Sequence, residues 1–421
     1  MQRGHLKCRK DAGFECMLKT EFNTLLTRID QLAKNHLFRV TNAWFGPESR
    51  SPSFLLCAVV LVALAISANV YIRHKQFQIW QSADSSSQIF DSPTFSTTDA
   101  PYFLTHAVSI QRGDPVVSFN SKRVYPNNLQ AAYETTDTSS LRDHPLLSVL
   151  IAGFAESDEP AGLLTAGNLG LFATSALTAL AITVCFGAAG YWAQGAIASL
   201  GGGLSAAYLV RSSIGRIDTD QLNLGFMYLM FGLVVFAGRS ASPLRCLGWC
   251  MFAGAAANLF MWWYGKPELI VMAAIALAWL ISCLHRNVFT LLAGTTMFLA
   301  LSGIVSFDPF SSPYLKDVFA EAGFIFPNTF ETITEIQTVS VAQILVNAAG
   351  SIEMGIVCLT GLALFLISNP VIAIAYSPLV AFGLLNFIIG SRAIFYSAPI
   401  LWFGAAFLMT SMARFVAANL S

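Results

Sequence analysis

Charged residues are scarce in this chain of 421 residues: they make up 11% of it, whereas 55% of the residues are hydrophobic and 12% are aromatic. This scarcity excludes an ordinary soluble protein, in which about 25% of residues carry a charge. The formal net charge is zero, so the composition gives no electrostatic reason to expect a nucleic-acid partner. Long apolar runs recur from Ser53 to the C-terminus. We therefore expect an all-α polytopic membrane protein.

Cysteine motifs are lacking as well. The chain has eight cysteines, mostly inside apolar stretches, and no CxxC pair, so the sequence indicates no disulfide framework. Cys246 and Cys250 are one helical turn apart in an apolar stretch, a pattern more typical of packing than of metal binding. The first apolar run is too long and too far from Met1 to be a cleaved signal peptide.

Residues 1–50 are polar and rich in Lys and Arg, and this basic excess beside the first apolar run predicts a cytoplasmic N-terminus. Apolar residues at helical spacing from Leu18 to Leu32 indicate an amphipathic helix on the membrane surface. Residues 51–421 then form the transmembrane domain, with about ten spans and both ends inside. The expected spans lie at about 53–72, 162–184, 186–209, 221–238, a fifth that ends at Trp262, 268–284, 288–305, 342–368, 371–389 and 395–413.

Three external loops follow from this topology, at 76–143, 211–220 and 307–341. The first is long and without obvious structure, and loops of that kind are usually functional or disordered. Residues 145–155 are apolar but too short to span, so we expect them along the surface. We expect His106 and His144 in the first loop to be solvated, and Lys266 and Lys316 to be surface charges. The cluster Trp262-Trp263-Tyr264 is ordinary for an interfacial belt.

The most distinctive polar stretch runs from Arg211 to Asn223, between two apolar segments, and contains Asp218-Thr-Asp220. Acids near a membrane edge are functional candidates, because charge is costly there. In extended backbone the carboxylates of Asp218 and Asp220 point to the same side. Two hard oxygen ligands on one side suit Mg²⁺ or Mn²⁺. Taken alone, the pair fits solvated loop acids equally well.

Two further acids, Asp99 and Glu335, come from the other two external loops and fall on the same side of the membrane in this topology. Carboxylates from separate loops around a divalent cation are a familiar oxygen-ligand site. Arg211, Tyr264 and Arg392 also fall on that side, and their side chains could neutralise a phosphate-bearing leaving group.

With these residues in place, the sequence resembles the catalytic subunit of oligosaccharyltransferases, of the single-subunit bacterial and archaeal type, which have the GT-C fold. Five stretches in order carry the resemblance: Asp99 in Asp-Ala-Pro-Tyr-Phe-Leu, Arg211 to Asn223, Trp262-Trp263-Tyr264, Thr332-Ile-Thr-Glu335, and Gly390-Ser-Arg392 through Pro399. The similarity covers roughly residues 53 to 415.

The resemblance implies an enzyme that transfers a glycan from a polyprenyl-pyrophosphate carrier to the side-chain amide of an acceptor Asn. It implies Mn²⁺ or Mg²⁺ held by Asp99, Asp220 and Glu335, with Asp218 as a further ligand or loop anchor. Asp99 and Glu335 would polarise the acceptor amide, and Arg392, Tyr264 and Arg211 would contact the donor pyrophosphate. The form of the Thr-Ile-Thr-Glu motif suggests a bacterial inner membrane with these loops in the periplasm.

The sequence also departs from the family pattern. Two spans are missing between the sixth and seventh, no Trp-Trp-Asp motif is present, and Asn347 stands where some bacterial members carry an Arg. The family's soluble C-terminal domain is not found before Ser421. Two alternatives therefore stay open. The chain is a non-catalytic or split-gene half that needs a partner chain for acceptor recognition, or it is a GT-C transferase with a non-protein acceptor. A transporter is less favoured, because transporter ion sites usually lie near the bilayer midplane.

Overall fold

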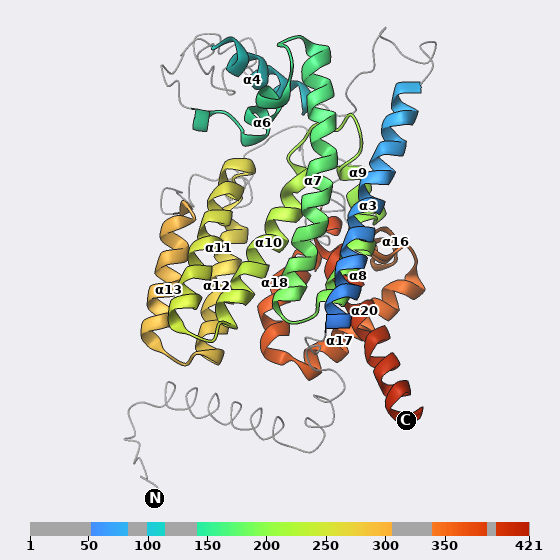
Figure 1. The fold of residues 1–421 in the computed structure, drawn as a ribbon, viewed down its shortest axis with the longest axis vertical. Helices are drawn as coiled ribbons and strands as arrows, with labels where there is room; N and C mark the ends of the chain where they lie inside the picture. Colours follow the sequence, from blue (N-terminus) through green and yellow to red (C-terminus); the bar gives the residue numbers. More distant parts are fainter. Residues whose placement is uncertain (1–51, 83–98, 114–140, 305–338, 385–392, 421) are drawn as a thin grey trace, which may run out of the picture.

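The structure, a computed structural model, describes residues 52–82, 99–113, 141–304, 339–384 and 393–420. Within these ranges the chain is helical and contains no strand. The elements, in chain order, are α3 (Pro52–Ser82), α4 (Ala100–Arg112), η4 (Leu141–Asp143), α6 (Leu146–Phe154), α7 (Pro160–Ala188), α8 (Trp192–Gly203), α9 (Ala206–Arg211), α10 (Asp220–Gly238), α11 (Pro243–Trp263), α12 (Pro267–Leu284), α13 (Val288–Leu301), α16 (Val341–Ala349), α17 (Ile352–Ser368), α18 (Pro370–Leu384) and α20 (Ile394–Leu420). Figure 1 shows them as one bundle, with α4 and α6 at one end.

Six of the described helices are long and apolar enough to cross a membrane, namely most of α3, α7 and α20 together with α10, α11 and α12. The number becomes seven if α16 and α17, which meet at a bend of 87°, form one broken span. Helices α13 and α18 are apolar but shorter. The prediction of an all-α polytopic membrane protein is therefore confirmed, although ten continuous spans are not seen among the described residues.

Two expected spans each consist of two helices, because the sequence contains capping residues within them. In the stretch expected to span from 186 to 209, α8 ends at Gly203 and α9 begins after Ser205, whose Oγ accepts a hydrogen bond from Tyr208 N at 3.4 Å. In the stretch expected from 342 to 368, α16 ends at Gly350 and Ser351 caps α17. Serine hydroxyls satisfy the free N–H groups of a new first turn, so each begins a second helix.

The first external loop is more structured than predicted. Helix α3 continues to Ser82, ten residues past the expected end of the first span, and α4 lies within the segment expected to be a plain loop. α4 packs on α6, and α6 packs on the outer part of α7. Arg112 Nε, in the last turn of α4, pairs with Asp158 Oδ2 at 2.7 Å, and this contact lowers the pKa of the Asp158 carboxyl. The apolar segment 145–155, which we expected to be too short to span, contains the helix α6.

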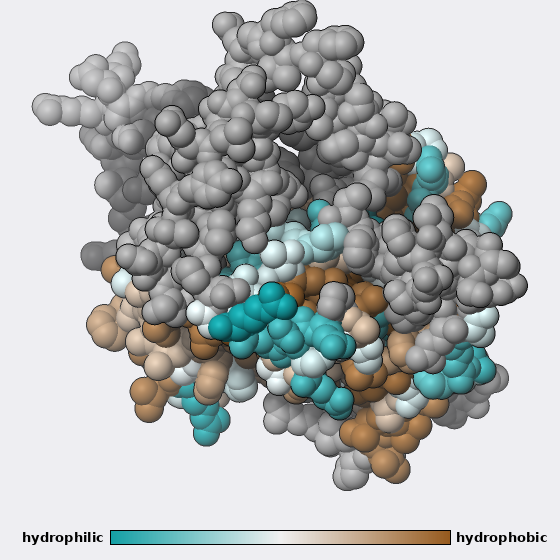
Figure 2. Space-filling view, turned by 90° about the horizontal axis from the view of Figure 1, so that it is seen from above, coloured by the Kyte–Doolittle hydropathy of each residue, from teal (hydrophilic) through white to brown (hydrophobic). Residues whose placement is uncertain are grey.

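Helix α10 is central: it packs on α7, α11 and α12, and most of its residues are buried. Its outer end lies near the level of α9, below α4 and α6 (Figure 1). Seen from above, hydrophilic side chains gather on the described surface of that end, near its centre (Figure 2). The acid-rich loop before α10 is thus held by the most buried helix of the bundle.

Candidate functional site

The loop between α9 and α10, residues 212–219, leads directly into Asp220, the first residue of α10. Asp218 and Asp220 thus lie together in a buried position. Asp218 is 6% exposed and Asp220 is 3% exposed. Asp220 is the first residue of α10, where the positive end of the helix dipole favours a carboxylate. Solvated loop acids, the alternative that the sequence left open, do not describe these two residues.

The loop is shaped by α7, against which it packs. Gly215 has φ of +81°, a left-handed conformation that glycine adopts without steric cost, and its N–H donates to Asn168 Oδ1 on α7 at 2.8 Å. Ile217 is fully buried. On the other side, the Tyr208 hydroxyl donates to the Gln221 carbonyl at 2.7 Å and thereby joins α9 to the first turn of α10.

Two arginines of the same stretch neutralise the two acids. Arg211 Nη1 lies 3.4 Å from Asp220 Oδ2. Arg216 Nη2 lies 3.6 Å from Asp218 Oδ2 and 3.9 Å from Asp220 Oδ2, so one guanidinium faces both carboxylates. All four side chains are at most 14% exposed. Paired charges are the form in which such groups tolerate burial.

The chemistry of the donor set fits a divalent cation. Asp218 Oδ2 and Asp220 Oδ2 converge on Arg216, where a positive charge already sits between them. Asn223 donates to Asp220 Oδ1 at 3.0 Å, while its own Oδ1 is buried without a hydrogen-bond partner. Carboxylate and amide oxygens are the ligands that Mg²⁺ and Mn²⁺ prefer. Among the described residues no three His, Cys, Asp or Glu side chains are grouped to hold a metal ion.

The other predicted site residues are distributed as follows. Asp99 precedes α4 as its N-cap residue and does not form a three-ligand group with Asp218 and Asp220. Glu335 and Arg392 lie outside the described residues. Arg211 is buried and paired with Asp220. The four-acid metal site and the contact of Arg211 and Arg392 with a pyrophosphate stay predictions.

Tyr264 is brought close to the acid loop through a second tyrosine. The side chain of Tyr396, near the start of α20, contacts those of Tyr264 and Asn223, and Asn223 in turn donates to Asp220. Trp263 Nε1 donates to the Thr219 carbonyl at 2.8 Å and is 2% exposed. The interfacial-belt interpretation is therefore wrong for Trp263, because its indole is buried against the acid loop.

Sequence reasoning missed Arg73. Arg73 is a residue of α3, and its side chain is fully buried in the bundle. Its guanidinium donates to Asn69 Oδ1 at 3.3 Å and to Ser212 Oγ, and it lies 5.4 Å from the centre of the Tyr208 ring. Its Nε is buried without a partner. Arg73 thus ties the first span to the start of the acid loop. The signal that could have found it is an arginine directly after the expected end of the first span at residue 72.

The prediction of solvated His106 and His144 is also wrong. The two residues are 8% and 6% exposed, and their Nδ1 atoms lie 3.1 Å apart. The ring of His106 also packs edge-on against Tyr102. This pair joins α4 to the segment that leads into α6, a contact across 38 residues that no local pattern announces.

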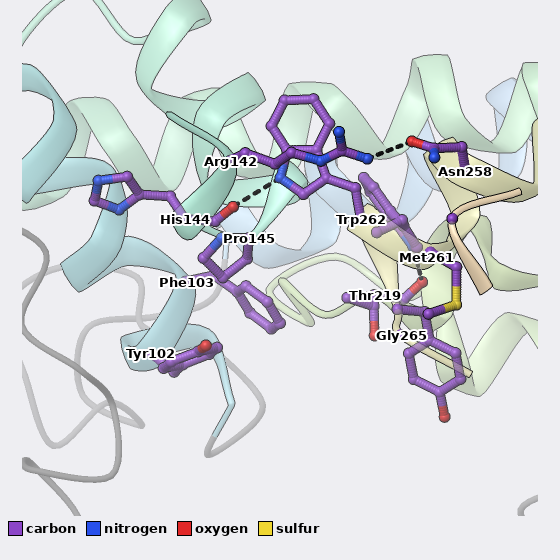
Figure 3. Close-up of a pocket in the computed structure, with 13 residues that line it drawn as sticks. Tyr102, Phe103, Arg142, His144, Pro145, Thr219, Asn258, Met261, Trp262 and Gly265 are labelled. Atoms are coloured by element: carbon purple, nitrogen blue, oxygen red, sulfur yellow. Dashed lines mark hydrogen bonds between the residues drawn. The ribbon is translucent and has the colours of Figure 1, made fainter. Parts of the chain in front are cut away.

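A cavity of about 700 Å³ opens between α4, the segment 142–145 and the outer end of α11. The end of α11 is joined to that segment by two hydrogen bonds, from Trp262 Nε1 to the His144 carbonyl at 2.9 Å and from Arg142 Nη2 to Asn258 Oδ1 (Figure 3). The residues that line it are Tyr102, Phe103, Arg142, His144, Pro145, Thr219, Asn258, Met261, Trp262, Trp263, Tyr264, Gly265 and Gly303. Thr219 of the acid loop lines the cavity, and Trp263 of α11, which also lines it, bonds to Thr219, so the two features adjoin.

No protein-family model matches the chain, and no curated protein sequence matches it. Solved structures are similar in fold. The apo oligosaccharyltransferase of Archaeoglobus fulgidus superposes with a TM-score of 0.61 at 11% identity, over 86% of this chain and 52% of the archaeal chain. The same enzyme tethered to an acceptor peptide with the NVT sequon gives 0.57 at 12% identity, over 83% and 49%.

The chain therefore has an oligosaccharyltransferase-like, multi-pass membrane fold, and it spans about half the length of the archaeal enzyme. This agrees with the GT-C-like bundle expected from the sequence.

Proposed function

We propose that this chain is an oligosaccharyltransferase-like glycosyltransferase that moves a glycan from a polyprenyl-pyrophosphate carrier to an acceptor, most simply the side chain of a protein Asn. The observation that carries the proposal is the buried, ion-paired Asp218–Asp220 loop at the outer end of an oligosaccharyltransferase-like fold. Two carboxylates and two guanidiniums are costly to bury, and a purely structural loop needs none of them.

In this proposal Asp218 and Asp220 hold Mn²⁺ or Mg²⁺, together with Asp99 and Glu335. The cation would supply charge stabilisation for the pyrophosphate as it leaves. Arg216 and Arg211 neutralise the two buried carboxylates, and Arg216 faces both of them at the point where the cation would bind. The support is the convergence of both Oδ2 atoms on one cationic group and the unpartnered Asn223 Oδ1 beside them.

The acceptor amide is a poor nucleophile, because its nitrogen lone pair is delocalised into the carbonyl. Asp99 and Glu335 would accept hydrogen bonds from the amide N–H groups and take up the proton that is lost. A bond then forms between the amide nitrogen and the anomeric carbon, the bond from that carbon to the phosphate oxygen breaks, and polyprenyl pyrophosphate leaves. Arg392 and Tyr264 would stabilise the charge on the departing oxygen.

We place the protein in a bacterial inner membrane, with the acid loop and the adjoining cavity facing the periplasm. The donor is then a lipid-linked oligosaccharide in the outer leaflet, and the acceptor is a polypeptide that has crossed the membrane. A partner chain that grips the acceptor would complete the assembly.

The test is glycan transfer in membranes that contain the full chain, a lipid-linked oligosaccharide extract and a fluorescent Asn-Val-Thr peptide. We expect Mn²⁺-dependent glycopeptide formation that Asp220→Asn lowers at least about a hundredfold, since the loss of a transition-state charge contact costs several kcal/mol. Asp158→Asn is the matched control, because Asp158 pairs with Arg112 at the surface. Equal transfer by Asp220→Asn and the wild type, at equal melting temperature, would remove the acid loop from the mechanism. No transfer by any form would favour the non-catalytic alternative.

A further inference from the structure

The cavity beside the acid loop has its own chemistry, distinct from the ion pairs that adjoin it. Aromatic rings form two walls: Tyr102 and Phe103 come from α4, and Trp262 comes from the outer end of α11 (Figure 3). Tyr264, which directly follows α11, also lines the cavity. Because the walls come from parts of the chain more than a hundred residues apart, the fold must bring them together to make the cavity.

These walls are fixed rather than loosely held. Trp262 Nε1 donates to the His144 carbonyl at 2.9 Å, and His144 contacts His106 of α4 through their Nδ1 atoms at 3.1 Å. The indole of Trp262 is thus connected to the opposite wall through one residue. Preorganised aromatic walls lower the entropy that a ligand must lose on binding.

Polar groups line one side of the same cavity. Arg142 and Asn258, joined by a hydrogen bond, carry a planar guanidinium and a planar amide with several donors between them. Among the described lining residues none is acidic, so these residues favour a neutral or anionic ligand over a cationic one. It is also too polar on that side for a lipid chain, whose surface is apolar throughout.

We propose that this cavity is a carbohydrate subsite, which binds sugar rings of the donor glycan adjacent to the carbon that reacts. A pyranose has C–H faces, which pack on the negative faces of aromatic rings, and a rim of hydroxyls, which bind planar donors and acceptors. The cavity volume of about 700 Å³ lies in the range of roughly 300–1,000 Å³ that holds ligands of drug size, so it suits a short oligosaccharide better than a single ring.

The position of the cavity supports the same ligand. Thr219 lies between Asp218 and Asp220 and also lines the cavity, and Trp263 bonds to its carbonyl. Tyr264 lines the cavity and contacts Tyr396, which reaches Asn223 beside Asp220. A glycan seated here would direct its linked end toward the acids. This assignment of the ligand as part of the donor rests on the proposed function, but the carbohydrate chemistry of the cavity does not.

The experiment is saturation-transfer NMR on the full chain in lipid nanodiscs free of glycoside detergent, with EDTA present. The probes are maltose, diacetylchitobiose and mannobiose, with sorbitol as a polyol that lacks a ring. We expect saturation transfer to the ring protons of at least one disaccharide and not to sorbitol. Trp262→Ala should reduce that signal at least fivefold, whereas Trp262→Phe, which keeps a ring face, should retain about half of it.

Phe252→Ala, on the same helix but 63% exposed and away from the cavity, is the matched control and should match the wild type. Tyr102→Ala tests the opposite wall and decides the matter if Trp262→Ala does not fold. No transfer to any disaccharide, or an unchanged signal in both wall variants, overturns the proposal. Because the probes carry neither a lipid nor a pyrophosphate and EDTA removes metal, sugar binding here together with no glycan transfer in the membrane assay would refute the enzyme and keep the subsite.

Discussion

Arg216 occupies the point where a cation is expected, since its Nη2 lies within 4 Å of both Asp218 and Asp220. A unit charge near 4 Å contributes about 4 kcal/mol at an effective dielectric constant of 20. Removal of Arg216 therefore takes away one of the two guanidiniums that oppose these buried carboxylates among the described residues. A divalent ion that binds there would no longer compete with the guanidinium.

We expect Arg216→Gln to bind Mn²⁺ at least about tenfold more tightly than the wild type. The measurement is the rise in melting temperature of EDTA-treated protein as Mn²⁺ is added. Arg112→Gln, which removes an exposed pair with Asp158, is the control and should behave as the wild type. A weaker response to Mn²⁺ in Arg216→Gln would contradict a metal site built on Asp218 and Asp220.

Among single residues, Asp218 and Asp220 could be identified from the sequence because carboxylates are rare beside apolar segments. It did not identify Asn168, which holds the loop through the Gly215 N–H, because one amide in an apolar helix carries no pattern of its own. Arg73 was hidden by the assumption that the first span stops before it, whereas α3 continues to Ser82. Partners of this kind are set by packing between helices, which spacing along the chain does not encode.

Among the helices, α17 and α20 cross at two glycines, and no larger residue fits at either position. A Cβ on Gly361 would lie within van der Waals overlap of the Gly404 carbonyl, and a Cβ on Gly404 would overlap the Cys358 carbonyl. Small residues allow such backbone approach between helices in membranes. The crossing positions the start of α20, and with it Tyr396, against α10.

We expect Gly361→Ala to lower the free energy of unfolding by roughly 1–3 kcal/mol, because the overlapping atoms are backbone and cannot rotate away. Thermal melting in detergent gives the measurement. Gly170→Ala is the control: Gly170 is half-buried on α7 and its Cβ would meet no atom within 4 Å, so the variant should melt as the wild type or slightly above it. Equal melting of the two variants would mean that α17 and α20 do not pack as described.

Some helix boundaries follow from the local sequence, and others depend on contacts with distant parts of the chain. The apolar runs predicted α10 and α12 to within two residues at each end, because a span is encoded by continuous hydrophobicity. The breaks at Ser205 and Gly350 fell inside runs that looked continuous, since one cap residue outweighs hydropathy locally. The helix α4 was read as loop because it is amphipathic and packs on α6, so its stability comes from tertiary contact.

For the whole molecule, the central consequence of the topology is that the acid loop and the opposite end of α10 lie on different sides of the membrane. α10 is 19 residues long, apolar and buried, and it runs from Asp220 to Gly238. At about 1.5 Å per residue it covers close to 30 Å, the thickness of the hydrocarbon core. Ser213 precedes it on the acid-loop side, and Ala241 follows it beside Arg239 and Arg245.

We expect Ser213→Cys to react with a membrane-impermeant maleimide in intact spheroplasts, and Ala241→Cys to react only after permeabilisation, because basic residues beside a span predict its cytoplasmic end. The described native cysteines are buried or partly buried within helices, and the wild type reports their background. Both positions should react with a permeant maleimide at similar rates, which controls for local access. Labelling of Ala241→Cys from outside, with Ser213→Cys protected, would mean that the acid loop faces the cytoplasm. That result would separate it from any donor in the outer leaflet and contradict the proposed function, while leaving the sugar-binding test of the cavity intact.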